Sequence, residues 1–446
     1  MDNTNATNSS SAVPRRIANI IINALKGGVV PRVGLEYVTV GRTQEINAIL
    51  RDIAIIEDGG ATFRFVVGKY GSGKSFLLQT IRNYAAEKGF AVADADLSPE
   101  RRFAGTKGQG LATYKELIRN LSTKSKPDGG ALPLVLEKWI SGVLTSVRGE
   151  YPEGHPEFDI AAEKRIFAVT NSLEGMVNGF EFAKAVNCYY KAYRTGDDTL
   201  KSNVLKWFRG EYPSKLEAKK DLDINLIVTD ETWYDFLKIF ASFMVSAGYK
   251  GIIVFVDELV NIFKIPHSVT RQNNYEKILT MYNDVLQGKA SHIGFLMGAT
   301  PQCVEDRYRG IYSYDALRSR LKDGHFSSDG LKDLSAPIIR LNMLTSEEMY
   351  VLLEKLRDMH AGLFGYGNTL THEDLMYFLN AEYNRVGADT HITPREIIRD
   401  FIELINIIHQ NPGLDVAGLL GSNSFALSKN SLTESEQHSD FVGFDI

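Results

Sequence analysis

The chain has 446 residues, which is too long for one ordinary hydrophobic core, so two or three compact units are expected. Its hydrophobic share of 44% and charged share of 24% are ordinary for a globular protein, and its net charge of −5 confines any DNA contact to a local basic patch. Only Cys188 and Cys303 are present, which excludes a disulfide framework and a cysteine zinc cluster. No apolar run approaches the ~20 residues of a membrane span, and the polar N-terminus lacks the apolar core of a signal peptide. We therefore expect a cytoplasmic protein without membrane contact.

Hydrophobic periodicity predicts an α/β fold with a parallel sheet. The Asn/Ser/Thr-rich residues 1–14 predict a disordered N-terminus. Helical spacing of apolar residues follows at 16–26 and at 43–56. Short apolar runs, each followed by a turn or helix signal, predict buried strands at 63–67, 90–95, 252–256, 293–298 and 338–342.

The spacing of these strands predicts the domain organisation. Residues 97–250 exceed what one crossover helix needs, so a large α-helical insertion is expected at about 120–232 within a nucleotide-binding core of residues 15–343. Residues 344–412 are predicted to form a helical lid, and 413–446 a flexible, Ser/Asn-rich tail that ends in FVGFDI. The lid contains two predicted capping boxes, Thr345 with Glu348 and Thr393 with Glu396, and Pro394 stands where a first helical residue is expected.

A phosphate-binding loop follows the first predicted strand, in FRFVVGKYGSGKSFLLQ. Residues 68–75 fit the pattern G-x-x-x-x-G-K-[ST] at every position, and an amphipathic helix follows. The glycines let the backbone aim its N–H groups at phosphate oxygens, and the start of the helix adds partial positive charge. Lys74 is expected to reach the β- and γ-phosphates of ATP, and Ser75 to ligate Mg²⁺. The predicted nucleotide-binding residues are Gly68, Tyr70, Gly71, Ser72, Gly73, Lys74, Ser75 and Phe76.

A second half of the site is predicted at IIVFVDEL, 252–259. Asp257 at the end of this strand is expected to hold the magnesium water shell, and Glu258 to orient and deprotonate the attacking water. The alternative is an ordinary strand that ends in solvent-facing acids. The adjacent glutamate favours hydrolysis over transfer to a small molecule, because a kinase has to exclude water as nucleophile.

Polar residues farther along the chain complete the predicted catalytic set. Thr300, after the fourth strand, is expected to contact the γ-phosphate or the lytic water, unless it is a simple strand-ending turn. Arg318 and Arg320 are candidates for an arginine finger that acts on the nucleotide of a neighbouring copy in a ring; a solvated basic face or contacts to a nucleic-acid backbone are the alternatives. Arg395, with Arg399 as fallback, is expected to fold from the lid onto the phosphates, the alternative being an exposed helix arginine.

Two weaker signals concern the adenine pocket of the nucleotide site and a separate surface for DNA. Val40 and Arg42 precede the first strand, where a segment often packs over adenine. Basic residues of the insertion, with Trp207 and Phe208 among them, offer a surface for double-stranded DNA, although neighbouring acids also allow a solvated helix face. These basic residues are Lys201, Lys206, Arg209, Lys215, Lys219 and Lys220.

Taken together, these motifs resemble the AAA+ class of P-loop ATPases, with VGRTQEI, VDE and GATP similar to its origin-recognition-complex-like branch. Longer segments resemble the BREX-system ATP-binding proteins of bacteriophage-defence islands (BrxD-like) over about residues 15–410. These segments include ADADLSPERR, GYKGIIVFVDELVNIFKI, NYEKILTMYNDVLQG, GATPQCVEDRYRGIYSYDALRSRL and ITPREIIRDF. The chain departs from the family at Tyr308, where the family's RRGIYSY-type stretch begins with arginine.

The resemblance implies a three-layer αβα core of AAA+ type and a defence ATPase that works in oligomeric, DNA-associated complexes beside a helicase. The leading hypothesis is therefore a ring-forming ATPase that loads or licenses a partner helicase on DNA. A nucleotide-dependent switch that oligomerises on sensing an invader product, and a scaffold that binds ATP structurally, are the alternatives. A small-molecule kinase is disfavoured, because no second-substrate pocket is legible in the sequence.

Overall fold

The computed structural model describes residues 13–322, 333–367, 370–384 and 392–421. Residues 1–12 of the predicted disordered N-terminus and the FVGFDI segment of the predicted tail lie outside this part of the chain. The chain divides into two compact units. The sheet unit is drawn from residues 44–68 and 80–341, and the loop unit from 1–43, 69–79 and 342–446.

The sheet unit is built on a five-stranded sheet in the order β2-β3-β4-β1-β5, with every neighbouring pair parallel. Parallel neighbours place the carboxyl ends of all strands along one edge, where ligands bind in open α/β sheets. Residues of β3 and β4 are almost entirely buried, which fits their continuous apolar runs. The strands are β1 (Ala61–Gly68), β2 (Ala91–Asp96), β3 (Ile252–Asp257), β4 (Ile293–Ala299) and β5 (Ile338–Leu341).

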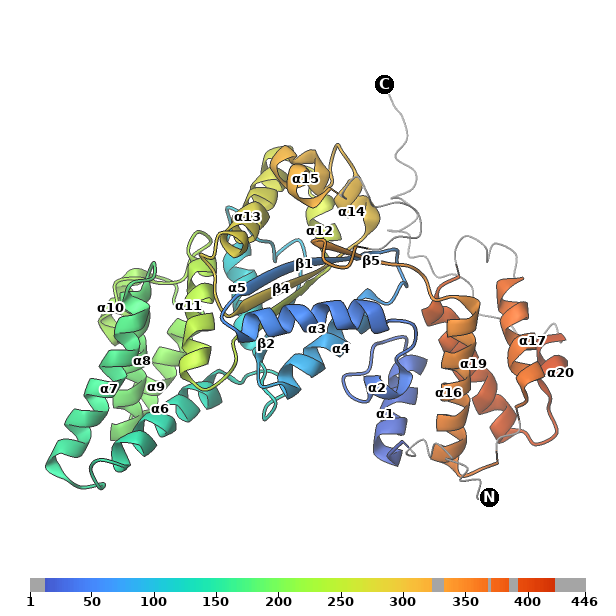
Figure 1. Ribbon diagram of the computed structural model, residues 1–446, viewed down its shortest axis with the longest axis horizontal. Coiled ribbons are helices and arrows are strands. Elements are labelled where there is room, and N and C mark those ends of the chain that lie inside the picture. The colour runs from blue at the N-terminus through green and yellow to red at the C-terminus, as the bar shows by residue number, and fades with distance from the viewer. Residues whose placement is uncertain (1–12, 323–332, 368–369, 385–391, 422–446) are drawn as a thin grey trace, which may run out of the picture. The chain divides into compact units, whose positions relative to one another are not determined.

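Helices cover both faces of this sheet (Figure 1). On one face Phe63 of β1 packs edge-on against Tyr282, with ring centroids 5.5 Å apart. On the other face Arg64 forms an ion pair of 2.7 Å with Asp52. Because successive strand residues point to opposite faces, these two contacts place α13 and α3 on opposite sides. From Thr43 to β5, the helices outside the long segment between β2 and β3, together with α5 just after β2, are α3 (Thr43–Glu57), α4 (Lys74–Glu87), α5 (Gln109–Arg119), α12 (Val260–Phe263), α13 (Ser268–Leu286), α14 (Pro301–Glu305) and α15 (Asp315–Leu321), with a 3-10 turn at Ile311–Ser313.

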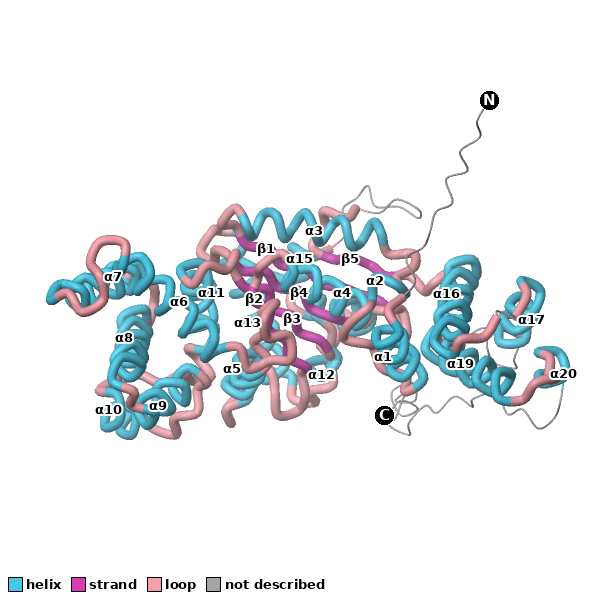
Figure 2. Tube along the Cα trace, turned by 90° about the horizontal axis from the view of Figure 1, so that it is seen from below, coloured by secondary structure: helices cyan, strands magenta, loops and turns pink. Residues whose placement is uncertain are grey.

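The long segment between β2 and β3 folds into further helices (Figure 2). Its core is aromatic: the Phe182 ring centroid lies 5.1 Å from those of Phe208 and Phe240 and 5.6 Å from that of Phe243. Buried aromatic rings supply large apolar areas. The aromatic residues of this segment and the apolar residues of the sheet form one continuous hydrophobic core. Its helices are α6 (Leu132–Arg148), α7 (Pro156–Glu174), α8 (Gly179–Thr195), α9 (Asp198–Phe208), α10 (Lys215–Leu222) and α11 (Trp233–Ser246).

The loop unit has a separate hydrophobic core, which α1, α16 and α19 share. Both predicted capping boxes are confirmed, and Pro394 is the first residue of its helix. A third box, Thr371 with Asp374, starts α17 and was not predicted. The helices of this unit are α1 (Arg15–Lys26), α2 (Leu35–Val38), α16 (Ser346–Phe364), α17 (His372–Tyr383), α19 (Pro394–Gln410) and α20 (Val416–Gly421), the last within the predicted tail.

The α/β class and the parallel five-stranded sheet are therefore confirmed. The strand boundaries agree with the predicted ones to within two residues. Of the helices in the described part of the chain, none is both long and apolar enough to span a bilayer.

Candidate functional site

The phosphate-binding loop runs from Lys69 to Gly73, between the last residue of β1 and the first residue of α4. Gly71 and Gly73 have φ angles of 77° and 87°, which disfavour any residue with a Cβ atom. The Lys74 ammonium donates a hydrogen bond to the carbonyl oxygen of Lys69 at 3.0 Å, so the lysine folds back over its own loop. The two glycines thus adopt the left-handed backbone conformation that a phosphate-binding loop of this pattern requires.

The two glycines have different surroundings within the loop unit. A Cβ atom on Gly71 would lie 2.8 Å from the Cβ of Thr393, at the start of α19. A Cβ atom on Gly73 would meet nothing within 4 Å. Gly71 is therefore required by a close approach of two segments, whereas the side of Gly73 on which a Cβ atom would stand is open.

The Ser72 hydroxyl is a second feature of the loop that suits ligand binding. Its residue is only 2% exposed, and its Oγ has no hydrogen-bond partner among the described residues. A buried hydroxyl without a partner is costly, so such a group calls for an acceptor or donor that the protein does not supply. The open space beside Gly73 and this hydroxyl both fit a bound nucleotide.

Arg42 binds the backbone of the loop. This arginine is 6% exposed, and its Nη2 donates to the carbonyl oxygens of Ser72 at 2.9 Å and Asn342 at 2.6 Å. Arg42 therefore joins the glycine loop to the segment that follows β5. Val40 and Phe76 pack half-buried against the hydrophobic core of the same unit.

Arg395 reaches the loop through a tyrosine. Its Nη1 donates to the Tyr70 hydroxyl at 2.9 Å, and its guanidinium carbon lies 5.5 Å from the centre of the Tyr70 ring. Tyr70 is 58% exposed. Arg395 was predicted to contact the phosphates, and in the structure it bonds a side chain of the loop; that prediction stays a proposal. Arg399 lies one turn farther on, with its Nε 3.8 Å from Asp400 Oδ1.

The carboxyl edge of the sheet carries the acidic residues. Asp257 ends β3 and lies directly opposite Asp96, which ends β2. The pKa of Asp96 is raised, first by desolvation and next by the negative charge of Asp257, although its side chain remains open to solvent. Sequence reasoning missed Asp96, although an acid that ends a buried strand was the same signal that identified Asp257.

Glu258 and Thr300 follow β3 and β4 at the same edge. Glu258 is exposed and has a φ angle of 62°, and its N–H donates to Asp257 Oδ1 at 2.8 Å. The Thr300 hydroxyl caps α14 by accepting a hydrogen bond of 3.3 Å from the N–H of Cys303. An accepting hydroxyl keeps its own proton for donation, so the cap and the predicted role of Thr300 are compatible.

The arginines after β4 make contacts within their own helix. Arg318 pairs with Asp315 at 2.7 Å, and Arg320 Nη1 donates to the carbonyl oxygen of Ala316 at 2.8 Å. Nearby, the N–H groups of Tyr308 and Arg309 both donate to Asp306 Oδ1, and Tyr308 is 88% exposed. Tyr308, the residue at which the chain departs from the family pattern, is thus exposed on a tight turn.

One predicted surface needs a correction. Trp207 and Phe208 are 1% and 0% exposed, because both belong to the aromatic core of the insertion. They cannot stack on nucleic-acid bases. Lysines remain exposed on α10, namely Lys215, Lys219 and Lys220.

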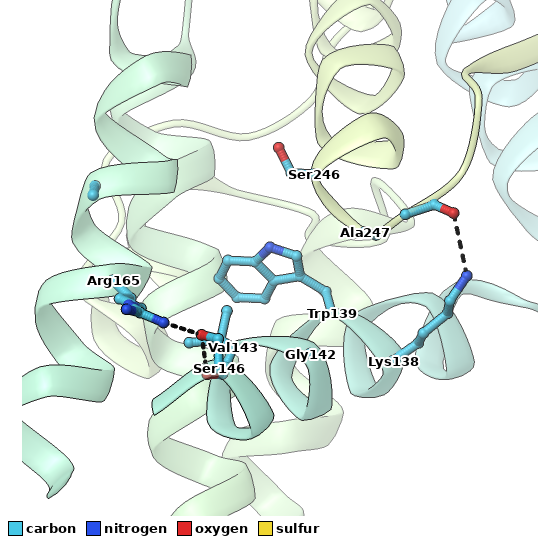
Figure 3. A pocket seen from close by; sticks show the side chains of 10 residues that line it. Lys138, Trp139, Gly142, Val143, Ser146, Arg165, Ser246 and Ala247 are labelled. Atoms are coloured by element: carbon cyan, nitrogen blue, oxygen red, sulfur yellow. Dashed lines mark hydrogen bonds between the residues drawn. The ribbon is translucent and has the colours of Figure 1, made fainter. Parts of the chain in front are cut away.

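A hollow of about 550 Å³ lies elsewhere, on the helical insertion (Figure 3). Trp139 forms part of its wall, Arg165 donates to the Ser146 hydroxyl, and Lys138 donates to the carbonyl oxygen of Gly248 at 3.4 Å. None of the predicted site residues lines it.

A comparison with protein families identifies the chain. Residues 13–424 match the model of the BREX system ATP-binding proteins BrxC/D. The chain belongs to this family. No curated protein matches it. The resemblance seen in the sequence is confirmed, and membership of the family supports ATP as the ligand and a role in BREX phage defence.

Mg²⁺ usually accompanies ATP, and the donor types at the two predicted positions suit it. Magnesium prefers hydroxyl, carboxylate and phosphate oxygens. Ser75 in the first turn of α4 and Asp257 at the end of β3 offer a hydroxyl and a carboxylate.

Proposed function

We propose that the protein is a Mg²⁺-dependent ATP hydrolase of the AAA+ class that oligomerises on ATP and acts in BREX defence with DNA and a partner helicase, as a loader or licensing factor. One observation carries this proposal. A glycine loop joins β1 directly to α4, in a parallel sheet whose strand β3 ends at Asp257 and is followed by Glu258. The order β2-β3-β4-β1-β5, followed by helices after β5, also fits that class.

In this proposal each residue has a separate task. Lys74 and the loop N–H groups bind the phosphates, and Glu258 accepts a proton from the water that attacks the γ-phosphorus. Thr300 donates a hydrogen bond to that water or to a γ-phosphate oxygen. Water is the nucleophile, so ADP and phosphate are the products.

Arginines complete the site from two directions. Arg395 is proposed to exchange its bond to the Tyr70 hydroxyl for one to a phosphate oxygen when ATP binds. Arg318 or Arg320 is proposed to act on the nucleotide of a neighbouring copy, where a guanidinium stabilises the charge of the transition state. Such a step makes hydrolysis depend on protein concentration.

The test is ATP binding and steady-state hydrolysis, each measured with and without double-stranded DNA. Lys74→Ala should lose binding, and Glu258→Gln should bind ATP normally but hydrolyse it about 100-fold more slowly, since general-base catalysis contributes 10²–10⁴-fold. Lys69→Ala is the matched control, because it removes an exposed lysine of the same loop and keeps the carbonyl oxygen that Lys74 uses. Undiminished hydrolysis by Glu258→Gln would refute the mechanism.

The proposed DNA contact rests on α10. Lys215, Lys219 and Lys220 are exposed there, but Glu217 lies among them, so the patch is modest. Replacing Lys219 and Lys220 by glutamate should weaken DNA binding and flatten its dependence on salt. The same replacement at Lys164 and Lys191, which are exposed on other helices of the insertion, is the control. Equal binding by both double variants would remove α10 from the proposal.

A triggered switch is the second candidate function. Arg318 and Arg320 both make contacts within α15, and in this candidate each copy holds its nucleotide until assembly draws one of these arginines away. This candidate predicts that ATP is bound but not turned over at any protein concentration without a trigger. Turnover that rises steeply with protein concentration would exclude it.

A further inference from the structure

The backbone of Glu258 has an unusual conformation for its residue type. Its φ angle of 62° lies in the left-handed region, which is unfavourable for a residue with a Cβ atom. Such strain persists only where surrounding contacts fix the backbone, and it is found frequently at functional positions. The question is therefore which residues of the sheet unit hold Glu258 in place.

Asn261 contributes the side chain that bridges this turn to a second loop. Its Nδ2 donates to the carbonyl oxygen of Leu97 at 2.8 Å and to that of Glu258 at 3.3 Å. The backbone N–H of Asn261 donates to the same Glu258 oxygen at 3.0 Å. Two carbonyl oxygens can only accept, so the amide nitrogen, and not the amide oxygen, must face them.

Backbone hydrogen bonds also hold this turn. Leu97 continues the pairing of β2 and β3 through an N–H bond of 3.1 Å to the Asp257 carbonyl oxygen, and Leu259 donates to the Gly298 carbonyl oxygen at 3.3 Å. The amide of Asn261 therefore ties three elements together: the end of β2, the turn that carries Glu258, and the start of α12.

We propose that Asn261 is a positioning residue, which holds Glu258 in its left-handed conformation so that the carboxylate is aimed at the attacking water. The inference rests on the proposed function, because Glu258 is the base of the hydrolysis. Asn261 acts on the rate of the chemical step and not on nucleotide binding. Without its amide, Glu258 relaxes toward a right-handed conformation, and its carboxylate leaves the place from which it accepts a proton of the attacking water.

The experiment compares three variants with a matched control. Asn261→Ala removes the amide, Asn261→Asp replaces the donor by an acceptor that repels both carbonyl oxygens, and Asn261→Gln restores a donor on a longer side chain. Asn120→Ala is the control: its Nδ2 also donates to a backbone carbonyl of β2, that of Asp94 at 2.9 Å, but it does not touch the Glu258 turn.

We expect kcat to fall about tenfold in Asn261→Ala and further in Asn261→Asp, since one net hydrogen bond corresponds to roughly that factor. KM and the ATP dissociation constant should stay within about twofold, and Asn261→Gln should recover part of the rate. In a Glu258→Gln background, Asn261→Ala should have no additional effect. Equal kcat values for Asn261→Ala and Asn120→Ala, or a fall in ATP affinity in place of kcat, would overturn the proposal.

Hydrogen exchange gives a readout that does not depend on hydrolysis. The amides of residues 257–262 should exchange about tenfold faster in Asn261→Ala than in wild type, and Asn120→Ala should leave them unchanged. Unchanged exchange in Asn261→Ala would overturn the positioning role. If Glu258→Gln hydrolyses ATP like wild type, the proposed function fails separately, and the exchange result still decides whether Asn261 fixes the turn.

Discussion

The phosphate loop and the acidic edge of the sheet are held in place by different kinds of contact. The loop is fixed by side chains that come from far along the chain: Arg42 bonds its backbone, and Arg395 bonds Tyr70. The acidic edge is fixed by the sheet ladder, in which Asp96 and Asp257 are paired residues of β2 and β3. Substitution of Arg42 or Arg395 should therefore change nucleotide affinity. Asp96 and Asp257, by contrast, should keep their positions unless the sheet itself unfolds.

The largest effect is expected at Gly71. Gly71→Ala combines backbone strain of about 1–2 kcal/mol with a clash against Thr393, and the two together should weaken ATP binding about 100-fold. The measurement is ATP titration by calorimetry. Gly130→Ala is the control, because Gly130 has a similar φ angle of 69° but open space around it. Equal losses of affinity in both variants would show that the close approach of Thr393 has no importance.

A somewhat smaller effect is expected for Arg42, which serves as the link between loop and lid. Arg42→Ala leaves two carbonyl oxygens without a charged donor, that of Ser72 in a buried position, and should lower the free energy of unfolding by about 2–3 kcal/mol. Denaturant titration measures this change, and ATP affinity should fall with it. Arg51→Ala, at an exposed position of α3, should change stability by less than about 0.5 kcal/mol. An Arg42→Ala variant as stable as Arg51→Ala would contradict the comparison.

A third prediction concerns the contribution of Arg395 to ATP affinity. If its guanidinium moves from Tyr70 to the γ-phosphate, Arg395→Ala should weaken ATP binding about tenfold and leave ADP binding nearly unchanged. Competition binding with both nucleotides measures the ratio. Arg399→Ala, one turn later on the same helix, is the matched control. Equal losses for ATP and ADP would place Arg395 in a purely structural role.

The smallest expected effect is a pH dependence of the free energy of unfolding, which arises from His360. Burial lowers the pKa of His360 below its usual 6.5, and its Nδ1 and Nε2 contact Tyr366 and Asn406. The folded state therefore binds fewer protons than the unfolded state just below pH 6.5, so stability is lost as the pH falls through that range, by at most about 1.4 kcal/mol per pH unit. Urea unfolding at several pH values measures the slope.

His360→Gln should flatten that slope, whereas His267→Gln, at an exposed position of the sheet unit, should leave it as in wild type. A slope that persists unchanged in His360→Gln would assign the pH dependence to other groups.

The sequence by itself determined the features that are encoded locally. Eight consecutive residues specify the glycine loop, since its turns need only glycine at positions with positive φ angles. Apolar runs specified all five strands, and Thr-x-x-Glu patterns specified two helix starts. Asp257 and Glu258 were also legible, because an acid after a buried strand lies at the ligand-binding edge of a parallel sheet.

Only the tertiary structure decided which distant residues serve these features. The pairing of Asp96 with Asp257 depends on strand order, and the bond between Asn261 and Leu97 joins segments that no local pattern connects. The burial of Trp207 and Phe208 likewise depends on which helix faces meet in the insertion. Side-chain partners of this kind are fixed by packing over long sequence separations, whereas loops and strands are fixed by the conformational preferences of neighbouring residues.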